Sequence, residues 1–228
     1  TLFRILTSLM IPDKGSARVA GCDVIADYKA LRKKIGYMPG RFSLYQDLTV
    51  FENLTFYASI FNTTIEANYH LIKDIYVQLE PFKDRRAGAL SGGMKQKLAL
   101  CCALIHKPEV LFLDEPTTGV DVVSRKEFWV MLRKLKSEGI TIFVSTPYMD
   151  EASMCDKIAL IQQGKILSSN TPDGLIDQFS ATLWAVKTDH LNHARMDLSE
   201  MEGVLDCYSF GEFLHLKSKF KIEEMPLV

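Results

Sequence analysis

The sequence predicts an α/β protein with a mostly parallel sheet flanked by helices, and two observations support this. The apolar run Val110–Leu113 is short and uninterrupted, as expected of a strand buried on both faces. An amphipathic helix over 124–137, closed by Gly139, and a second apolar strand over 141–145, also expected to be buried, come next. A strand, a helix and a strand in this order predict a right-handed parallel crossover.

The elements before this crossover follow from periodicity and turn residues. Apolar residues at i, i+3, i+4 and i+7 predict a helix over 1–10, which Pro12 and Gly15 end. Short strands are expected over 16–19 and 34–38. The pattern over 44–106 is mainly helical, and the last of these helices starts directly after Ser91-Gly92-Gly93.

The chain changes character near residue 180. Before it, the segments 157–161 and 165–168 flank a turn and predict a hairpin. After it, short strands are expected over 183–187, 204–210 and 213–216. We therefore expect an α/β domain over 1–180 and a small β-rich appendage over 181–228.

Composition narrows the function classes. The 228 residues suffice for one domain with a large core, or for one domain and a small appendage. Lys and Arg number 27 and Asp and Glu 28, so the net charge gives no overall attraction to nucleic acid or to an acidic membrane. No apolar run approaches the ~18 residues that span a bilayer, so a role at a membrane requires docking to another polypeptide.

The five cysteines form no CxxC pair and are expected to be buried free thiols.

An acidic pair follows the strand 110–113. In an open α/β sheet ligands bind at the carboxyl ends of the strands. Asp114 is therefore placed to hold Mg²⁺ through water, and Glu115 to activate a water for attack on a phosphate. By itself this motif is weak, because an acidic pair after a strand is more often a solvated turn.

A second motif begins the helix before that strand. Ser91 stands at an N-cap position, and Gly92 and Gly93 allow a ligand to approach the backbone closely. The unpaired N–H groups and the dipole of the helix favour an anion there. Taken alone, Ser-Gly-Gly also suits an ordinary capped helix.

Together the two motifs resemble the signature motif and the Walker B strand of the ABC ATPase family. The segment Thr117–Asp121 is similar to the D-loop of that family. The resemblance covers at least 1–179 and is closest to the ATP-binding components of drug- and antibiotic-efflux exporters. It implies a P-loop NTPase-like fold with a helical subdomain over about 44–106.

The resemblance also implies ATP and Mg²⁺ as cofactors and two ATP-binding domains that face each other head to tail. Ser91, Gly92 and Gly93 would contact the γ-phosphate of the ATP held by the second domain. Asp114 and Glu115 would serve the chain's own ATP as metal ligand and catalytic base, and Asp121 would lie at the seam. A transmembrane permease subunit is the expected partner, nucleic acid is not, and the expected location is the cytoplasmic face of the cell membrane.

The family's Walker A loop, G-x-x-x-x-G-K-[ST], is absent from the sequence. In the family it directly precedes a helix of the kind expected over 1–10, so Thr1 matches the residue just after the loop. We expect that the chain is truncated there and that, as printed, it binds ATP poorly.

Two internal positions also depart from the family. Gly40 stands where the family usually has a Gln that contacts Mg²⁺ and the attacking water. Pro147 stands where it usually has a His that reaches the γ-phosphate. Our hypothesis is that this domain binds ATP but hydrolyses it slowly, while its intact signature loop serves a partner domain.

Two other interpretations stay open. A non-catalytic, nucleotide-sensing or regulatory ABC module is favoured by Gly40 and Pro147 and opposed by the intact Asp114 and Glu115. A soluble ABC protein acting on ribosomes or DNA is opposed by the lack of a long charged linker.

Overall fold

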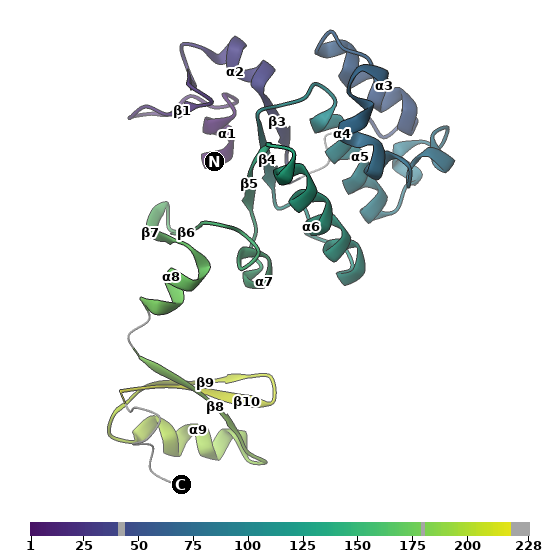
Figure 1. The fold of residues 1–228 in the computed structure, drawn as a ribbon. Coiled ribbons are helices and arrows are strands. Elements are labelled where there is room, and N and C mark those ends of the chain that lie inside the picture. Colours follow the sequence, from purple (N-terminus) through teal and green to yellow (C-terminus); the bar gives the residue numbers. More distant parts are fainter. Residues whose placement is uncertain (41–43, 179–180, 220–228) are drawn as a thin grey trace. The chain divides into compact units, whose positions relative to one another are not determined.

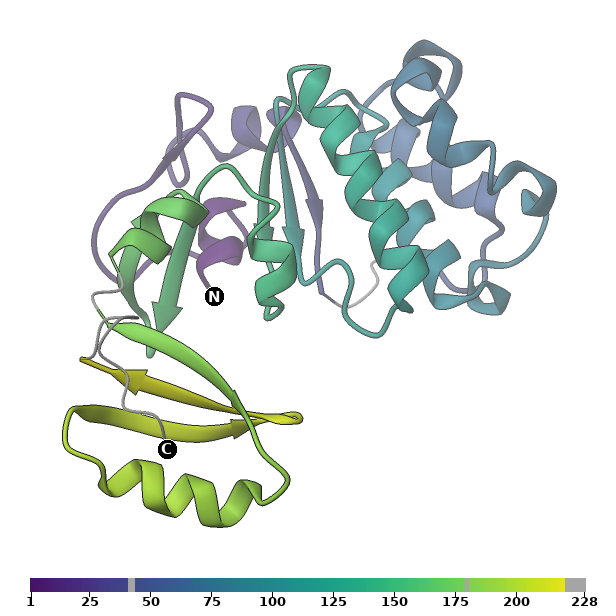
Figure 2. The ribbon, with the colours of Figure 1, turned by 60° about the horizontal axis from the view of Figure 1, so that its bottom comes forward.

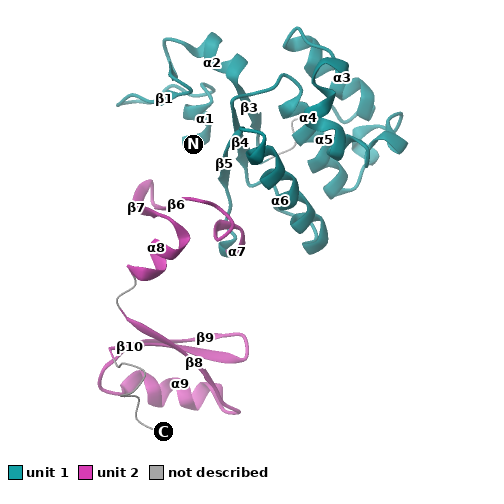
Figure 3. Ribbon diagram, viewed as in Figure 1, with its two compact units in different colours: residues 1–149 teal, residues 150–228 magenta. Residues whose placement is uncertain are grey.

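A computed structural model describes residues 1–40, 44–178 and 181–219, and it divides the chain into two compact units (Figure 3). The first unit comprises residues 1–149 and the second residues 150–228. The boundary expected at residue 180 falls inside the second unit, beside residues 179–180, which lie outside the described residues.

A three-stranded parallel sheet forms the centre of the first unit, in the order β3-β4-β5 (Figure 1). The register pairs Met38 with Leu113 and Asp114 with Ser145, so the carboxyl ends of the strands meet at one edge. Helix α6 joins β4 to β5, which confirms the predicted parallel crossover. The bounds are Ile35–Met38 for β3, Val110–Asp114 for β4, Val122–Ser137 for α6 and Thr141–Ser145 for β5.

Helices cover both faces of this sheet. On one face, Phe3 of α1 (Leu2–Leu6) contacts Phe112 with ring centroids 5.7 Å apart. On the other, α5 (Gly92–Leu104) packs against β3. Gly36 permits this contact, because a Cβ there would lie 2.4 Å from the carbonyl oxygen of Ala103. The middle strand β4 is therefore buried on both faces, as its apolar run predicted.

A group of helices packs around α5. It contacts α3 (Val50–Ile60), α4 (Tyr69–Tyr76) and α6. Figure 2 shows α6 beside the strands, with α3 and α4 farther from them. The side chains of Lys97 on α5 and Glu127 on α6 form an ion pair at 2.7 Å. Single 3₁₀ turns occupy Glu66–Asn68, Glu80–Phe82 and Ala87–Ala89.

Some of the sequence predictions in this unit need correction. The first helix ends at Leu6 instead of Met10, because Ser8 takes a left-handed φ of 59° and the Leu9 N–H donates to the carbonyl of Arg4 at 2.7 Å. Strand β5 is not buried on both faces, since Phe143 is 40% exposed. Strand β1 (Arg18–Val19) lies within the strand predicted over 16–19, whereas β2 (Cys22–Asp23) and α2 (Tyr28–Lys34) were not predicted.

The second unit holds a hairpin and a small sheet. The hairpin is β6 (Ile158–Gln162) with β7 (Lys165–Asn170), as predicted, and α8 (Pro172–Asp177) follows it. The sheet is antiparallel, in the order β8-β10-β9, and contains β8 (Thr182–Lys187), β9 (Val204–Phe210) and β10 (Phe213–Ser218). Helix α7 (Met149–Ala152) spans the division between the units.

Helix α9 (Leu191–Glu200) was not predicted in this unit. Its Leu191, Ala194 and Leu198 recur at helical spacing and pack on one face of the sheet, against Leu214 and Leu216. The helix was missed because it has few apolar residues, so its apolar stripe is too short to stand out from the polar residues around it.

Four of the five cysteines are buried as predicted, whereas Cys155 is only partly buried. All five cysteines are free thiols, and burial raises the pKa of Cys101 and of Cys102. Of the helices in the described ranges, none has the length and apolar character needed to cross a membrane.

Candidate functional site

The acidic pair lies at the carboxyl edge of the central sheet. Asp114 is the last residue of β4 and is partly exposed, and Glu115 directly after it is exposed. The neighbouring strand supplies Ser145, whose hydroxyl donates a hydrogen bond of 2.5 Å to Oδ1 of Asp114. The backbone N–H of Glu115 donates to the carbonyl oxygen of Ser145 at 3.0 Å and to its Oγ at 3.1 Å. Both acidic residues are thus held by the end of β5.

The backbone of Glu115 is in a strained conformation. Its φ is +49°, in the left-handed region that side chains with a Cβ rarely adopt. Its side chain is also oriented, because the hydroxyl of Thr118 donates to Oε2 of Glu115 at 3.2 Å. Strain that the surrounding bonds maintain is often found at functional sites.

Gly40 lies against the same pair. A Cβ on Gly40 would be 3.1 Å from the carbonyl oxygen of Asp114 and 3.9 Å from Cβ of Glu115. The residues that follow, 41–43, lie outside the described residues. The pKa of Tyr37 on β3 is raised, first by burial and second by the charge of Asp114.

Pro147 is exposed and follows β5 by two residues. The loop around it is held by its neighbours. The N–H of Tyr148 donates to Oγ1 of Thr146 at 3.1 Å, and the guanidinium of Arg125 lies 4.1 Å from the centroid of the Tyr148 ring. Proline itself has neither an N–H group nor a side chain that can donate or accept a proton.

Helix α5 has its predicted N-cap at Ser91, but it begins at Gly92, two residues before the predicted start. Ser91 is the N-cap of α5, and its hydroxyl accepts a hydrogen bond of 3.3 Å from the N–H of Met94. Ser91 and Gly92 are exposed and Gly93 is partly exposed, so the first turn of α5 is accessible. The remaining N–H groups of that turn can bind an anion.

The first turn of α5 packs against the start of α6. A Cβ on Gly92 would lie 3.7 Å from the carbonyl oxygen of Gly119, and one on Gly93 would lie 3.0 Å from Oγ of Ser124. Asp121 is the N-cap of α6 and accepts hydrogen bonds from the N–H groups of Val123 and Ser124 at 3.1 and 3.0 Å. These bonds, led by that of Ser124, lower the pKa of Asp121.

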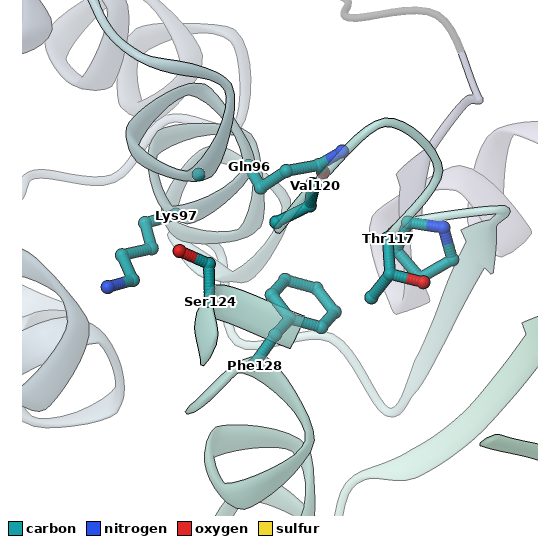
Figure 4. A pocket seen from close by; sticks show the side chains of 8 residues that line it. Gln96, Lys97, Thr117, Val120, Ser124 and Phe128 are labelled. Carbon is teal, nitrogen blue, oxygen red and sulfur yellow. The ribbon is translucent and has the colours of Figure 1, made fainter. Parts of the chain in front are cut away.

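A small pocket lies between the two helices (Figure 4). Gln96 on α5 is 5% exposed, and within the described part of the chain its Oε1 has no hydrogen-bond partner. Thr117, from the loop between β4 and α6, is 1% exposed and also lines the pocket. The full lining comprises Gly93, Gln96, Lys97, Pro116, Thr117, Val120, Ser124 and Phe128.

The structure therefore groups the predicted site residues into two clusters. One contains Asp114, Glu115 and Gly40 at the sheet edge, and the other contains Ser91, Gly92, Gly93 and Asp121 where α5 meets α6. The segment 115–121 connects them in sequence. Thr1 is exposed and stands at the N-cap of α1, without a side-chain hydrogen bond to cap it.

Sequence reasoning missed Ser145 and Thr118 as partners of the acidic pair. A signal for Ser145 was present, because the two apolar strands predicted to be parallel end in Asp114 and Ser145. Thr118 belongs to a segment already singled out, but its bond depends on the turn made by Glu115.

The donor set suits magnesium and phosphate. Mg²⁺ prefers oxygen ligands and retains several waters, so one carboxylate such as Asp114 at an accessible sheet edge fits it. The accessible first turn of α5 fits a phosphate oxygen. The chemistry of these groups is that of a site for a nucleotide with its metal.

Comparisons with known proteins show the family of the chain. A family model described as ABC transporter matches residues 1–118. The probable multidrug ABC transporter ATP-binding protein YbhF of Escherichia coli (strain K12) is 43% identical over 198 residues, which are 86% of this chain and 34% of YbhF. The Nod factor export ATP-binding protein I of Burkholderia lata is 37% identical over 180 residues, which are 78% of this chain and 59% of that protein.

Solved structures show the same fold. The ATP-binding subunit of an ABC transporter superposes with a TM-score of 0.70 at 24% identity, covering 78% of this chain and 75% of that one. A dimeric, post-hydrolysis state of the ATP-binding cassette MJ0796, bound to ADP and Pi, superposes with a TM-score of 0.66 at 23% identity, covering 75% of this chain and 78% of that one. These likenesses confirm the predicted P-loop NTPase-like α/β fold.

The chain spans about a third of YbhF and less than two thirds of the Nod factor export protein. The family model covers helix α5 and the acidic pair. The chain therefore belongs to the ABC transporter family and carries the ATP-binding domain of such a transporter.

Proposed function

We propose that this chain is the nucleotide-binding subunit of an export-type ABC transporter, which couples ATP binding and hydrolysis to export through a transmembrane permease. The names of its relatives, a multidrug transporter component and an export protein, support the direction of transport. The observation that carries the proposal is the acidic pair Asp114-Glu115 at the carboxyl edge of the sheet, held by Ser145. The proposed location is the cytoplasmic face of the cell membrane.

In this proposal each cluster serves a different nucleotide. Asp114 holds Mg²⁺ at the chain's own ATP, and Glu115 takes a proton from the attacking water. Thr1 lies beside the phosphates of that ATP. Ser91, Gly92 and Gly93 contact the ATP of a second ABC domain, identical or different, and Asp121 lies at the seam between the two domains.

The chemistry of the chain's own groups follows from their contacts. Glu115 is exposed, so water reaches it, and Thr118 holds Oε2. Oδ1 of Asp114 is held by Ser145, which orients the carboxylate. When bound, Mg²⁺ supplies positive charge that neutralises the phosphate oxygens.

We further propose that the chain's own site hydrolyses ATP slowly. Gly40 has no side chain to offer beside Asp114, and Pro147 offers neither a donor nor a base near the end of β5. Two missing polar groups at one sheet edge remove two contacts that a transition state needs. The first turn of α5 keeps its Ser91 cap and its accessible N–H groups. In this proposal it contacts the ATP of a partner domain that hydrolyses ATP at the usual rate.

The experiment combines Gly40→Gln with Pro147→His in the natural protein and measures ATP turnover per site. If the missing groups limit the rate, turnover rises by about 100-fold or more, the range of a positioned acid or base. A Cβ at position 40 would already approach the Asp114 carbonyl oxygen at 3.1 Å, so Gly40→Ala with Pro147→Ala is the matched control for steric effects.

Unchanged turnover in the Gln and His variant would reject the weakened site. The variant Glu115→Gln gives the background, because it keeps the shape of the side chain and removes the base. A natural protein that binds ATP, and whose turnover equals this background before and after the restoration, would favour the nucleotide-sensing module instead.

A further inference from the structure

Ser145 occupies a special place in the sheet. It is the last residue of β5, and the parallel register sets it directly beside Asp114, the last residue of β4. No feature of the residue by itself marks it as functional, because serine at a strand end is common. Its contacts distinguish it, since both members of the acidic pair bond to it.

Two of these bonds form a chain with a defined direction. The N–H of Glu115 donates to Oγ of Ser145 at 3.1 Å, and the hydroxyl of Ser145 donates to Oδ1 of Asp114 at 2.5 Å. A serine hydroxyl has a single proton, so its donation to Asp114 leaves the oxygen to accept from Glu115. A hydrogen bond to an ionised carboxylate is among the stronger ones.

The hydroxyl and the backbone of Ser145 make different hydrogen bonds with the acidic pair. The N–H of Glu115 also donates to the carbonyl oxygen of Ser145 at 3.0 Å, a bond that any residue at position 145 preserves. The orientation of the Asp114 carboxylate depends on the hydroxyl alone among these contacts. Removing the hydroxyl should therefore change the direction of a carboxylate more than the path of the backbone.

We propose that Ser145 is a positioning residue for the metal site, an inference that rests on the proposed function of Asp114. Its hydroxyl donates to one carboxylate oxygen of Asp114 and so fixes the orientation of the carboxylate. The other oxygen then faces the metal ion that accompanies the nucleotide. Groups that hydrogen-bond to metal ligands commonly contribute 10- to 100-fold to metal affinity.

The test uses a matched pair of variants in the natural protein. Ser145→Thr and Ser145→Val have nearly the same shape, and both suit a strand, but only threonine keeps the hydroxyl. The affinity for Mn²⁺, as a probe for Mg²⁺, is measured by electron paramagnetic resonance in the presence of a non-hydrolysable ATP analogue. We expect Ser145→Val to weaken Mn²⁺ binding about tenfold and Ser145→Thr to stay within about twofold of the wild type.

A second measurement separates positioning from folding. The affinity for the nucleotide without metal should be the same in both variants, and circular dichroism should show the same fold. Ser218→Ala serves as a control, because it removes another strand-end hydroxyl, the one that accepts a hydrogen bond of 2.9 Å from Trp184 in the second unit. If Ser145→Val does not fold, Ser145→Ala carries the same expectation with a smaller side chain.

The outcomes distinguish the two proposals. A wild-type protein that takes up no Mn²⁺ with the nucleotide rejects the proposed function of Asp114, and the role of Ser145 with it. A wild type that binds Mn²⁺ normally, together with valine and threonine variants that match each other, rejects the role of Ser145 alone. Weakening by valine with retention by threonine supports both.

Discussion

Gly93→Ala should destabilise the first unit, whereas Gly92→Ala should not. Both glycines lie in the first turn of α5, but their surroundings differ. A Cβ at position 93 would lie 3.0 Å from Oγ of Ser124 and 3.3 Å from its Cβ. Both distances are shorter than a Cβ normally keeps from other heavy atoms. A Cβ at position 92 would lie 3.7 Å from the carbonyl oxygen of Gly119, an ordinary contact.

The magnitude follows from these contacts. In a helix, alanine is more favourable than glycine by up to about 1 kcal/mol, and both variants gain this equally. Overpacking costs about 1–3 kcal/mol and applies to position 93 alone. Ser124 cannot turn away without loss, because its side chain is hydrogen-bonded to Asp121. The free energy of unfolding should therefore be lower for Gly93→Ala than for Gly92→Ala by about 1–3 kcal/mol.

Urea unfolding of the two variants, followed by tryptophan fluorescence and circular dichroism, measures this difference. Trp129 reports on α6, the helix that contains Ser124. Adding Ser124→Ala to Gly93→Ala removes Oγ and should recover part of the lost stability. Equal unfolding midpoints for Gly92→Ala and Gly93→Ala would show that the close contact with Ser124 does not limit position 93.

Two further predictions concern the segment between β4 and α6. Asp121→Ala should lower stability at neutral pH, because the N–H of Ser124 favours the charged carboxylate and lowers its pKa. That contribution to stability is present above the pKa of the unfolded state and is lost as the pH falls through the pKa of the folded state. The urea midpoints of variant and wild type should therefore converge in acid, and a difference that stays constant with pH would contradict this. Glu115→Gly should be more stable than Glu115→Ala by about 1 kcal/mol, since φ is +49° at this position, and equal urea midpoints would show that the backbone there is not strained.

Local patterns were enough to predict most of the elements that position the site. The apolar run of β4 predicted a strand covered on both faces, and Ser91 predicted the start of α5, because capping and periodicity act over a few neighbouring residues. The same local rules missed α9, whose apolar stripe is short, and predicted that β5 is buried although Phe143 is 40% exposed. The burial of a strand depends on the elements that pack against it, and the sequence of the strand indicates this only in part.

The sequence by itself determined the family, the two motifs and the absence of side-chain chemistry at Gly40 and Pro147, since residue types need no coordinates. Tertiary structure alone decided which groups meet. Ser145 reaches Asp114 across 31 residues because the parallel register brings two strand ends together. Gly93 is constrained by Ser124 because α5 and α6 approach closely at their first turns. Contacts of this kind are set by the packing of whole elements. The predicted pairing of two strands could indicate the contact of Ser145, but no local pattern indicates the contact of Gly93 with Ser124.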